Sequence, residues 1–292
     1  MAESKFPKNR RGQTMMIVGI IVLLVSFAVI LFFIFRLNLG SQSNSEVCRN
    51  SVLLQAKGTK YFGNSLQCKT DYVCISGGGK CDNMTTSITI NVDPTDKNQI
   101  FKAIADQMAN CWYTFGEGQL NWLGPSVNGA RLCAVCSVIG FDPTIQQTKP
   151  FHTLQDCLSF YKDTVGGPQV CGAMFSTSTP YTQVFTYREF IDYLGNTQKT
   201  QAQTYLQYLY GVNLQDFVNQ PAVASFYNSY SISTGDQFSI LTGRATGPLF
   251  NLFGSGTIDS QAVVLLKTTD ISNDMVDSKG NSLCSEFVTQ AS

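Results

Sequence analysis

The feature that most restricts the fold of this chain is an apolar stretch near its N-terminus. The sequence from Met15 to Phe35 is MMIVGIIVLLVSFAVILFFIF, 21 residues without a charged side chain. A helix of that length measures about 31 Å, close to the ~30 Å hydrocarbon core of a bilayer. A cleaved secretory signal peptide is the alternative, but its apolar region usually has about 7–15 residues and precedes a small-residue cleavage site. The stretch therefore predicts a transmembrane helix in contact with membrane lipid.

Basic residues on one side of this stretch predict its orientation. Lys5, Lys8, Arg10 and Arg11 precede it, and only Glu3 opposes them. By the positive-inside rule, the N-terminus stays in the cytoplasm and the C-terminal part lies outside the cell membrane. We therefore expect a single-pass protein with a basic cytoplasmic tail (1–14), a transmembrane helix (15–36), a polar stalk (37–47) and an extracytoplasmic domain (48–292).

The exported part contains every cysteine of the chain. An even number of cysteines outside the membrane predicts disulfide bonds, each stabilising the fold by about 2–4 kcal/mol. Their connectivity cannot be read from the sequence. Residues 48–81 hold four of them among glycines and polar residues, so we expect this cysteine-rich part to depend on its bridges. The ten cysteines are Cys48, Cys68, Cys74, Cys81, Cys111, Cys133, Cys136, Cys157, Cys171 and Cys284.

Spacing patterns in the exported domain predict both helices and strands. The clearest helix follows Asp93, a suitable cap, and stops at Gly116, with apolar residues at the spacing of one helical face between them. Because helices and strands are interspersed, the domain is predicted to be α+β with a mixed sheet. We expect helices that begin at Asp93, Thr153, Thr186 and Thr200, the last two ending at Gly195 and Gly211, and strands over residues 86–92, 132–141, 237–241 and 262–267.

The CxxC spacing of Cys133 and Cys136 admits three interpretations. A redox dithiol needs its first cysteine at a helix N-terminus, and a zinc site needs two further ligands at similar spacing. The surrounding sequence LCAVCSVIGF is typical of a strand, on which residues three apart point to opposite faces. We therefore expect the two cysteines to bond to different partners.

The sequence presents no convincing catalytic constellation, so we predict no catalytic residues. Glu117 lies between two glycines, where a carboxylate can serve a hydrolase, but such a segment is more typical of a helix stop. His152 is the single histidine, and the nearest nucleophile, Ser159, lies on the same expected helix. The glycine run 77–79 lacks the strand, helix and lysine context of a phosphate loop.

Composition and charge exclude further classes. Twenty Lys and Arg balance twenty Asp and Glu, so there is no basic excess to bind nucleic acid. A single histidine excludes a His-rich metal site, and Asp270, Asp274 and Asp277 lack the 1-3-5 spacing of a calcium loop. We predict no nucleic-acid partner, no metal and no cofactor.

Two features favour contact with a partner or with further copies of the chain. Tyrosines gather between Tyr181 and Tyr230, and tyrosine is enriched at interfaces, although half or more are expected in the core. A long glycine-flanked loop is expected either to fold back over the core or to contact a partner or the membrane. Its large apolar residues are Leu249, Phe250, Leu252 and Phe253.

The junction Arg10-Arg11-Gly12-Gln13, which runs into the apolar stretch, resembles an archaeal class III (prepilin-type) signal peptide. The resemblance covers roughly residues 8–35. It implies that a membrane peptidase cuts between Gly12 and Gln13, leaving the helix to hold the subunit in a membrane or filament. Ile17 stands where pilins usually carry glutamate, which counts against filament assembly more than against processing. The exported part also resembles archaeal single-pass ectodomains through CWYTFGEG and CAVC, a resemblance that implies no activity.

These observations predict a membrane-anchored surface protein with a non-enzymatic binding, structural or pilin-like role. Asn83 begins the single N-glycosylation sequon and lies on the exported side. The competing class is an extracytoplasmic enzyme. It would be either a thiol-disulfide oxidoreductase using Cys133 and Cys136 or a carboxylate-dependent hydrolase using Glu117.

Overall fold

The chain divides into two units, Met1–Ser43 and Asn44–Ser292, in a computed structural model. In the first unit, residues 20–27 are helical and their side chains are exposed. In the part of the chain that the structure describes, no helix has both the length and the apolar character needed to cross a membrane. The described residues are 20–27, 44–57, 66–82, 84–120, 122, 132–147, 155, 158–159, 162, 171–172, 183–219, 230–244, 261–272, 284 and 286–287.

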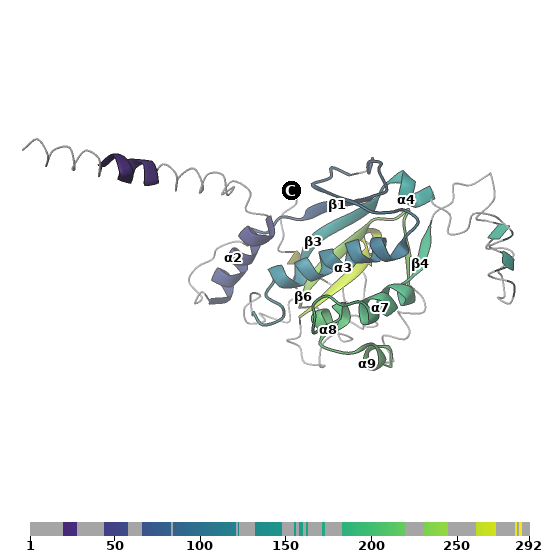
Figure 1. Ribbon diagram of the computed structural model, residues 1–292. Helices are drawn as coiled ribbons and strands as arrows, with labels where there is room; N and C mark the ends of the chain where they lie inside the picture. The colour runs from purple at the N-terminus through teal and green to yellow at the C-terminus, as the bar shows by residue number, and fades with distance from the viewer. Residues whose placement is uncertain are drawn as a thin grey trace, which may run out of the picture. The chain divides into compact units, whose positions relative to one another are not determined.

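The second unit is built on a six-stranded mixed sheet (Figure 1). Its strands are β1 (Asp71–Ser76), β2 (Ile88–Asn91), β3 (Leu132–Phe141), β6 (Phe238–Arg244), β7 (Ala262–Lys267) and β8 (Glu286–Phe287). The order is β2-β1-β3-β6-β7, with β8 pairing to β3 as well. Strand β1 runs parallel to β2 and β3, whereas β6 is antiparallel to β3 and β7. A separate antiparallel pair is formed by β4 (Val184–Thr186) and β5 (Ser231–Ser233).

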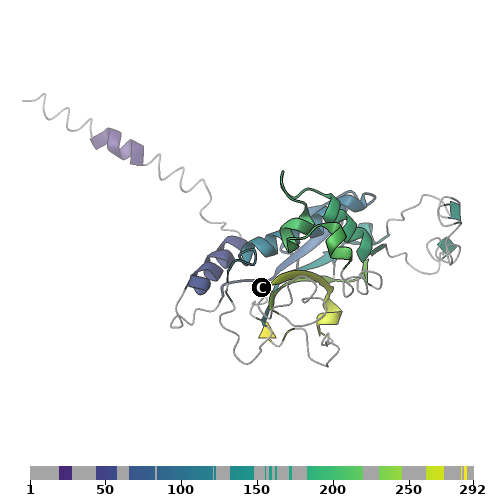
Figure 2. The same cartoon turned by 90° about the horizontal axis from the view of Figure 1, so that it is seen from below.

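Helices pack on this sheet around α3 (Lys97–Thr114), which contacts β3, β6 and β7. Figure 1 shows α3 lying along the strands, and Figure 2 shows the same packing from below. Helices α2 (Asn44–Lys57), α7 (Tyr187–Asn196) and α8 (Tyr205–Tyr210) contact α3 in turn, and α9 (Leu214–Val218) contacts α7. Short helices α4 (Pro143–Gln147) and α12 (Thr268–Ser272) follow β3 and β7. The predicted α+β class with disulfides is therefore confirmed.

Helix α3 is the predicted long helix, but it starts later than expected. The cap is Asp96, which accepts a hydrogen bond from the Asn98 backbone, rather than Asp93. Asp93 instead accepts two hydrogen bonds from Thr95, so Asp93-Pro94 forms a turn that ends before the helix begins. The predicted apolar face is buried in full, from Ile100 to Phe115.

The predicted stop at Gly116 is confirmed. Gly116 has a φ of 87°, and its backbone N–H bonds to the Tyr113 carbonyl, while that of Glu117 bonds to Trp112. This pair of bonds is the arrangement that ends many helices at a left-handed glycine.

The two capping-box predictions had different outcomes. Thr186 and Glu189 form both bonds of a capping box at the start of α7, as expected. The second helix begins four residues later than predicted, because Thr204 with Gln207 caps α8, whereas Thr200 accepts hydrogen bonds within a tight turn. Gly211 ends α8 in the left-handed conformation, as predicted. Gly195 does not end α7: it lies inside the helix, where a Cβ would come within 2.8 Å of the Leu214 Cβ in α9.

Strand predictions were most accurate for the buried strands. Strands β3 and β7 have the predicted bounds, β2 is shorter than residues 86–92, and β6 extends to Arg244. No strand was predicted in the cysteine-rich part, but it supplies β1, whose Val73 and Ile75 are fully buried between neighbouring strands.

Helix α2 begins at Asn44, so residues 44–47 of the predicted stalk are helical. The helix predicted at Thr153 starts outside the described residues.

Candidate functional site

Disulfides account for all the described cysteines. The pairs are Cys48–Cys68, Cys74–Cys81, Cys111–Cys136 and Cys133–Cys284, and Cys171 is disulfide-bonded as well. None of the described cysteines is free. Cys157 lies outside the described residues. The prediction of a bridged domain is confirmed for the described part of the chain.

The CxxC pair is divided between two bridges, as the strand assignment predicted. Cys136 lies where the β3–β6 register shifts between Val135 and Ser137, and it bonds to Cys111 of α3. Cys133 bonds to Cys284, just before β8. A redox dithiol must form a disulfide between its own two cysteines, so this arrangement does not support that chemistry. Within the described ranges, no group of three or more His, Cys, Asp or Glu side chains could hold a metal ion.

Three of these disulfides gather at the amino ends of the parallel strands β1 and β3. Cys48–Cys68 ties α2 to the segment that enters β1, and Cys111–Cys136 ties α3 to β3. Cys133–Cys284 ties the C-terminal segment to the same end of β3. Strand β8 pairs with Leu132 and Cys133, whereas β1 pairs with β3 only from Ser137 onward, so β8 and β1 share one edge of β3.

A small polar cavity of about 20 Å³ lies beside two of these disulfides, Cys48–Cys68 and Cys111–Cys136. The cavity is lined by residues from the first turn of α2, the end of α3 and the start of β1. It is also lined by the part of β3 where the pairing with β1 begins. Asp71 and Ser137 line it together because they are register partners in the parallel β1–β3 pair. Ser137 is 3% exposed, and its hydroxyl has no hydrogen-bond partner among the described residues. Burial raises the pKa of Asp71, against a hydrogen bond from the Asn44 amide at 3.3 Å. The cavity volume matches about one water molecule, the species that commonly serves such a group.

The carboxyl ends of β1 and β3 are held by a different device, the buried carboxylate of Asp142. Ser76 Oγ and the Gly79 backbone N–H donate to its Oδ2 at 2.9 and 2.6 Å. Thr144 Oγ1 and the Ile145 backbone N–H donate to its Oδ1 at 2.7 and 2.9 Å. Burial alone would raise the pKa of Asp142, but these hydrogen bonds to the ionised form outweigh it and lower the pKa.

This carboxylate explains the glycine run at residues 77–79. A Cβ at Gly79 would lie 2.7 Å from Asp142 Oδ2, and one at Gly77 would lie 2.5 Å from Thr144 Oγ1. Since the Gly79 N–H already binds an internal anion, the loop closes on Asp142 rather than on a phosphate. Asp142 was not predicted as a site residue, although its sequence carries the signal: Asp142-Pro143 after a strand is a helix cap followed by proline at the first helical position.

A second cavity, of about 80 Å³, opens beside this end of β3. Met84 and Phe141 give it an apolar wall, and Asp82 and Asp236 lie on its rim. Asp236 is paired with Lys267 at 2.7 Å. This ion pair neutralises the charge of the Asp236 carboxylate within the domain.

Glu117 is part of a tertiary contact rather than a carboxylate pair. It has a φ of 56°, between two left-handed glycines, and Tyr208 donates its hydroxyl to Glu117 Oε1 at 2.6 Å. Glu117 lines neither of the two cavities. A left-handed conformation costs a non-glycine residue about 1–2 kcal/mol, which the Tyr208 bond helps to offset. Nearby, Arg49 lies 3.6 Å from the Tyr113 ring centre and joins α2 to the end of α3.

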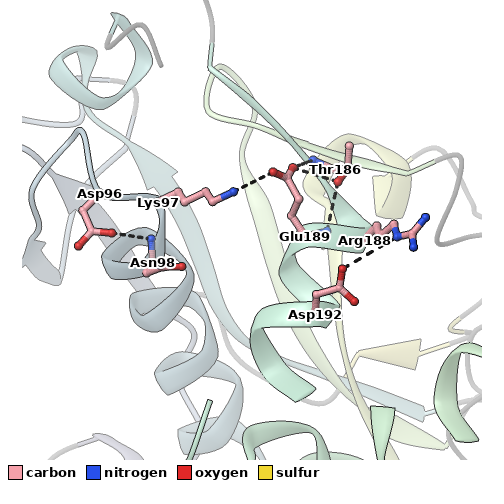
Figure 3. A network of polar contacts seen from close by, with 7 residues as sticks. All are labelled: Asp96, Lys97, Asn98, Thr186, Arg188, Glu189 and Asp192. Carbon is pink, nitrogen blue, oxygen red and sulfur yellow. Dashed lines mark hydrogen bonds and ion pairs between the residues drawn. The ribbon is translucent and has the colours of Figure 1, made fainter. Parts of the chain in front are cut away.

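An ion pair joins the N-termini of α3 and α7 (Figure 3). Lys97 Nζ lies 3.0 Å from Glu189 Oε1, and the other oxygen of Glu189 accepts from the Thr186 backbone. Burial raises the pKa of Glu189, but the bonds from Thr186 and Lys97 outweigh it and lower that pKa. Arg188 and Asp192, 3.9 Å apart, lie one turn apart on α7. This network holds the N-terminus of α7 against that of α3.

Several of the described tyrosines are buried or hydrogen-bonded within the domain instead of forming an exposed surface. Tyr187 and Tyr205 are 3% exposed, and burial raises the pKa of both phenols. Four hydroxyls donate to acceptors within the domain: Tyr205 to Asp106, Tyr208 to Glu117, Tyr210 to the Val263 carbonyl and Tyr230 to Asp270. The last bond also places Asp270 in a tertiary contact.

Several predicted site residues lie outside the described residues, so their predictions stand as they were. They are Gly12, Gln13, Asn83, His152, Leu249, Phe250, Leu252, Phe253, Asp274 and Asp277. No known protein family, curated protein or solved structure matches the chain.

Proposed function

We propose that the protein is a single-pass membrane protein that displays a disulfide-bonded domain outside the cell membrane, for binding or structural purposes. The observation that carries the proposal is that the described cysteines are all bridged. Such bridges persist in oxidising compartments outside the cytosol. The uncharged stretch from Met15 to Phe35 and the basic residues before it support the same orientation.

The test uses intact cells that express the full chain with a C-terminal epitope tag. Added protease is expected to remove the tag signal while a cytoplasmic marker protein survives. A membrane-impermeant maleimide is expected to label the chain only after an impermeant reductant has been added. A tag that is cut only in permeabilised cells, or thiols that react without reductant, would contradict the proposal.

A pilin-like variant of this role follows from the resemblance at the N-terminus. It requires cleavage between Gly12 and Gln13, followed by association of the apolar helices. Intact-mass measurement of the purified protein distinguishes a chain that begins at Gln13 from one that begins at Met1 or Ala2. Sedimentation of filaments then separates assembly from simple anchoring.

A non-catalytic role is supported by the candidate catalytic residues themselves. Cys133 and Cys136 have different disulfide partners, and Glu117 is bonded to Tyr208 rather than paired with a second carboxylate. The predicted loop around Phe250 and Phe253 is expected either to fold back over the core or to contact a partner or the membrane. If it contacts a partner, replacement of both by serine leaves folding intact and reduces self-association or partner capture at the cell surface, whereas loss of folded protein would favour packing on the core.

A further inference from the structure

Strand β2 is an edge of the six-stranded sheet, and its outer side is open. It lies at one end of the order β2-β1-β3-β6-β7, and β1 is its one pairing partner among the described residues. Ser87, Thr89 and Asn91 are exposed, and Ile88 is 36% exposed. The strand at the other end of this order differs, because residues 262–266 of β7 are at most 1% exposed. An open edge presents backbone N–H and C=O groups that a further strand can bind.

The sequence of β2 lacks the features that usually protect an edge strand from pairing. Such edges commonly carry lysine, proline or a bulge. Residues 84–92 contain no charged residue, no proline and no glycine, and Ile88–Asn91 pairs with β1 in an unbroken register. Isoleucine and threonine, which alternate along β2, favour extended backbone. This chemistry selects an extended strand as the occupant of the open edge.

The side-chain pattern of β2 matches its own reverse. Ile90 and Val92 pack against the buried core, and Ile88 shares their face because alternate residues of a strand do. If a second β2 pairs antiparallel about a two-fold axis at Ile90, Ile88 lies opposite Val92. Thr89 then lies opposite Asn91 on the other face. Apolar side chains meet apolar ones and polar meet polar, so β2 is complementary to itself.

The distribution of charge also suits a second copy. In a two-fold contact each charge near the axis approaches its own copy, so a charged strand would repel itself. The first charged residue after β2 is Asp93, which would lie opposite Ser87. The two copies of Asp93 would be six residues apart along the pair, about 20 Å, which is beyond the ~8 Å screening length of physiological salt.

We propose that β2 pairs with β2 of a second copy of this chain, antiparallel, so that the two sheets become one continuous sheet. The added strand covers Ile88 and binds the open backbone groups of the edge. Because β2 has four residues, the contact is smaller than the ~1,200 Å² of a stable interface and is weak in solution. Anchoring in one membrane raises the effective concentration of the copies. To that extent the inference rests on the proposed function, which it deepens by naming the partner.

Energy transfer between full-length chains in phosphatidylcholine vesicles tests the proposal. Separate batches carry a donor or an acceptor fluorescent protein at the C-terminus. They are made in a host without N-glycosylation, because Asn83 begins a sequon five residues before β2. Transfer is expected to rise with the protein-to-lipid ratio. Absence of transfer from the unmodified chain at every ratio would overturn the proposal.

Charge substitutions on the exposed face of β2 test whether this edge makes the contact. Thr89→Lys with Asn91→Lys places like charges opposite each other, and association is expected to weaken about tenfold. Thr89→Glu with Asn91→Glu is expected to do the same. A mixture of the two variants places opposite charges across the pair and is expected to return to within about twofold of the unmodified chain.

A matched control adds the same charge elsewhere. Gln201→Lys with Gln203→Lys changes two exposed residues in the turn before α8, outside the sheet, and is expected to change association by less than about twofold. Equal transfer from the unmodified chain and both charged β2 variants would overturn the proposal and assign association to another surface, such as the apolar stretch. Weakening that the mixture does not reverse would overturn it as well.

A peptide competitor keeps the test independent of how the variants fold. The peptide of residues 86–92, added to the unmodified chain at about millimolar concentration, is expected to lower transfer, because its strand occupies the same edge. A peptide of the same composition in scrambled order is the control. Equal effects of the two peptides would contradict pairing at β2.

The protease test on intact cells separates this inference from the proposed location. If the C-terminal tag survives protease while transfer in vesicles depends on the β2 charges, the surface location is wrong and the pairing stands. If the tag is cut while the mixed variants do not recover transfer, the pairing is wrong and the location stands.

Discussion

The two ends of the parallel strands β1 and β3 are held by different chemistry. At the amino ends, three disulfides tie α2, α3 and the C-terminal segment to the strands. At the carboxyl ends, four hydrogen bonds to one buried carboxylate, Asp142, tie the glycine loop to α4. The first device is covalent and does not respond to protonation, whereas the second joins the ends of β1 and β3, 63 and 66 residues apart, through hydrogen bonds that depend on a charge.

Removal of the longest bridge, Cys133–Cys284 at the amino ends, is expected to have the largest effect on the free energy of unfolding. Cys133→Ser with Cys284→Ser opens a loop of 151 residues, so the free energy of unfolding is expected to fall by about 5 kcal/mol through the gain of unfolded-state entropy. Chemical denaturation followed by far-UV circular dichroism measures the change. A loss below about 2 kcal/mol would show that the C-terminal segment is held mainly by noncovalent contacts.

At the carboxyl ends, Asp142→Ala is expected to lower the free energy of unfolding by about 2–4 kcal/mol, because it removes the α4 cap and leaves buried donors unpaired. Asp82→Ala, in the neighbouring exposed loop, is the matched control and is expected to change it by less than about 0.5 kcal/mol.

The same carboxylate gives this end a dependence on pH. Hydrogen bonds hold the pKa of Asp142 below its ordinary value of 3.8. The stabilisation is therefore present above that ordinary value and is lost as the pH falls through the lowered pKa of the folded state. Denaturation curves between pH 6 and pH 2 are expected to converge for the unmodified chain and Asp142→Ala at the acid end. A constant gap between the two curves would assign the effect of Asp142 to packing instead of charge.

The short bridge near the carboxyl ends is expected to contribute less. Cys74→Ser with Cys81→Ser opens a loop of only 7 residues, which corresponds to about 2 kcal/mol. Thermal unfolding of this variant beside the Cys133 and Cys284 variant compares the two bridges directly. If the short bridge proves the more stabilising, loop length is not what determines their contributions.

The smallest effect is expected at the amino-end cavity. Ser137→Ala removes a buried hydroxyl without a partner among the described residues, so the free energy of unfolding is expected to stay within about 1 kcal/mol or to rise. A loss above about 2 kcal/mol would mean that the hydroxyl bonds to an ordered water in the cavity beside Asp71.

The buried elements could be predicted from the sequence more accurately than their boundaries. Strands β3 and β7 and the buried face of α3 follow directly from apolar spacing, and Gly116 and Gly211 mark helix ends because only their conformation suits those positions. The starts of α3 and α8 were misplaced, since Asp93 and Thr200 carry the same capping signatures as Asp96 and Thr204, and only the surrounding turns distinguish them. Strand β1 was missed because its cysteines and polar neighbours obscured a short apolar run.

What the sequence by itself determined is chemical and local: which residues are apolar, where helices can be capped, and that cysteines confined to one side of an uncharged stretch would be oxidised. Which cysteine meets which, and that Asp71 lies beside Ser137 and Ser76 beside Asp142, was decided by the tertiary structure alone. These pairs are brought together by the parallel register of β1 and β3. That register depends on the packing of the whole sheet against α3, and no local pattern of residues encodes it.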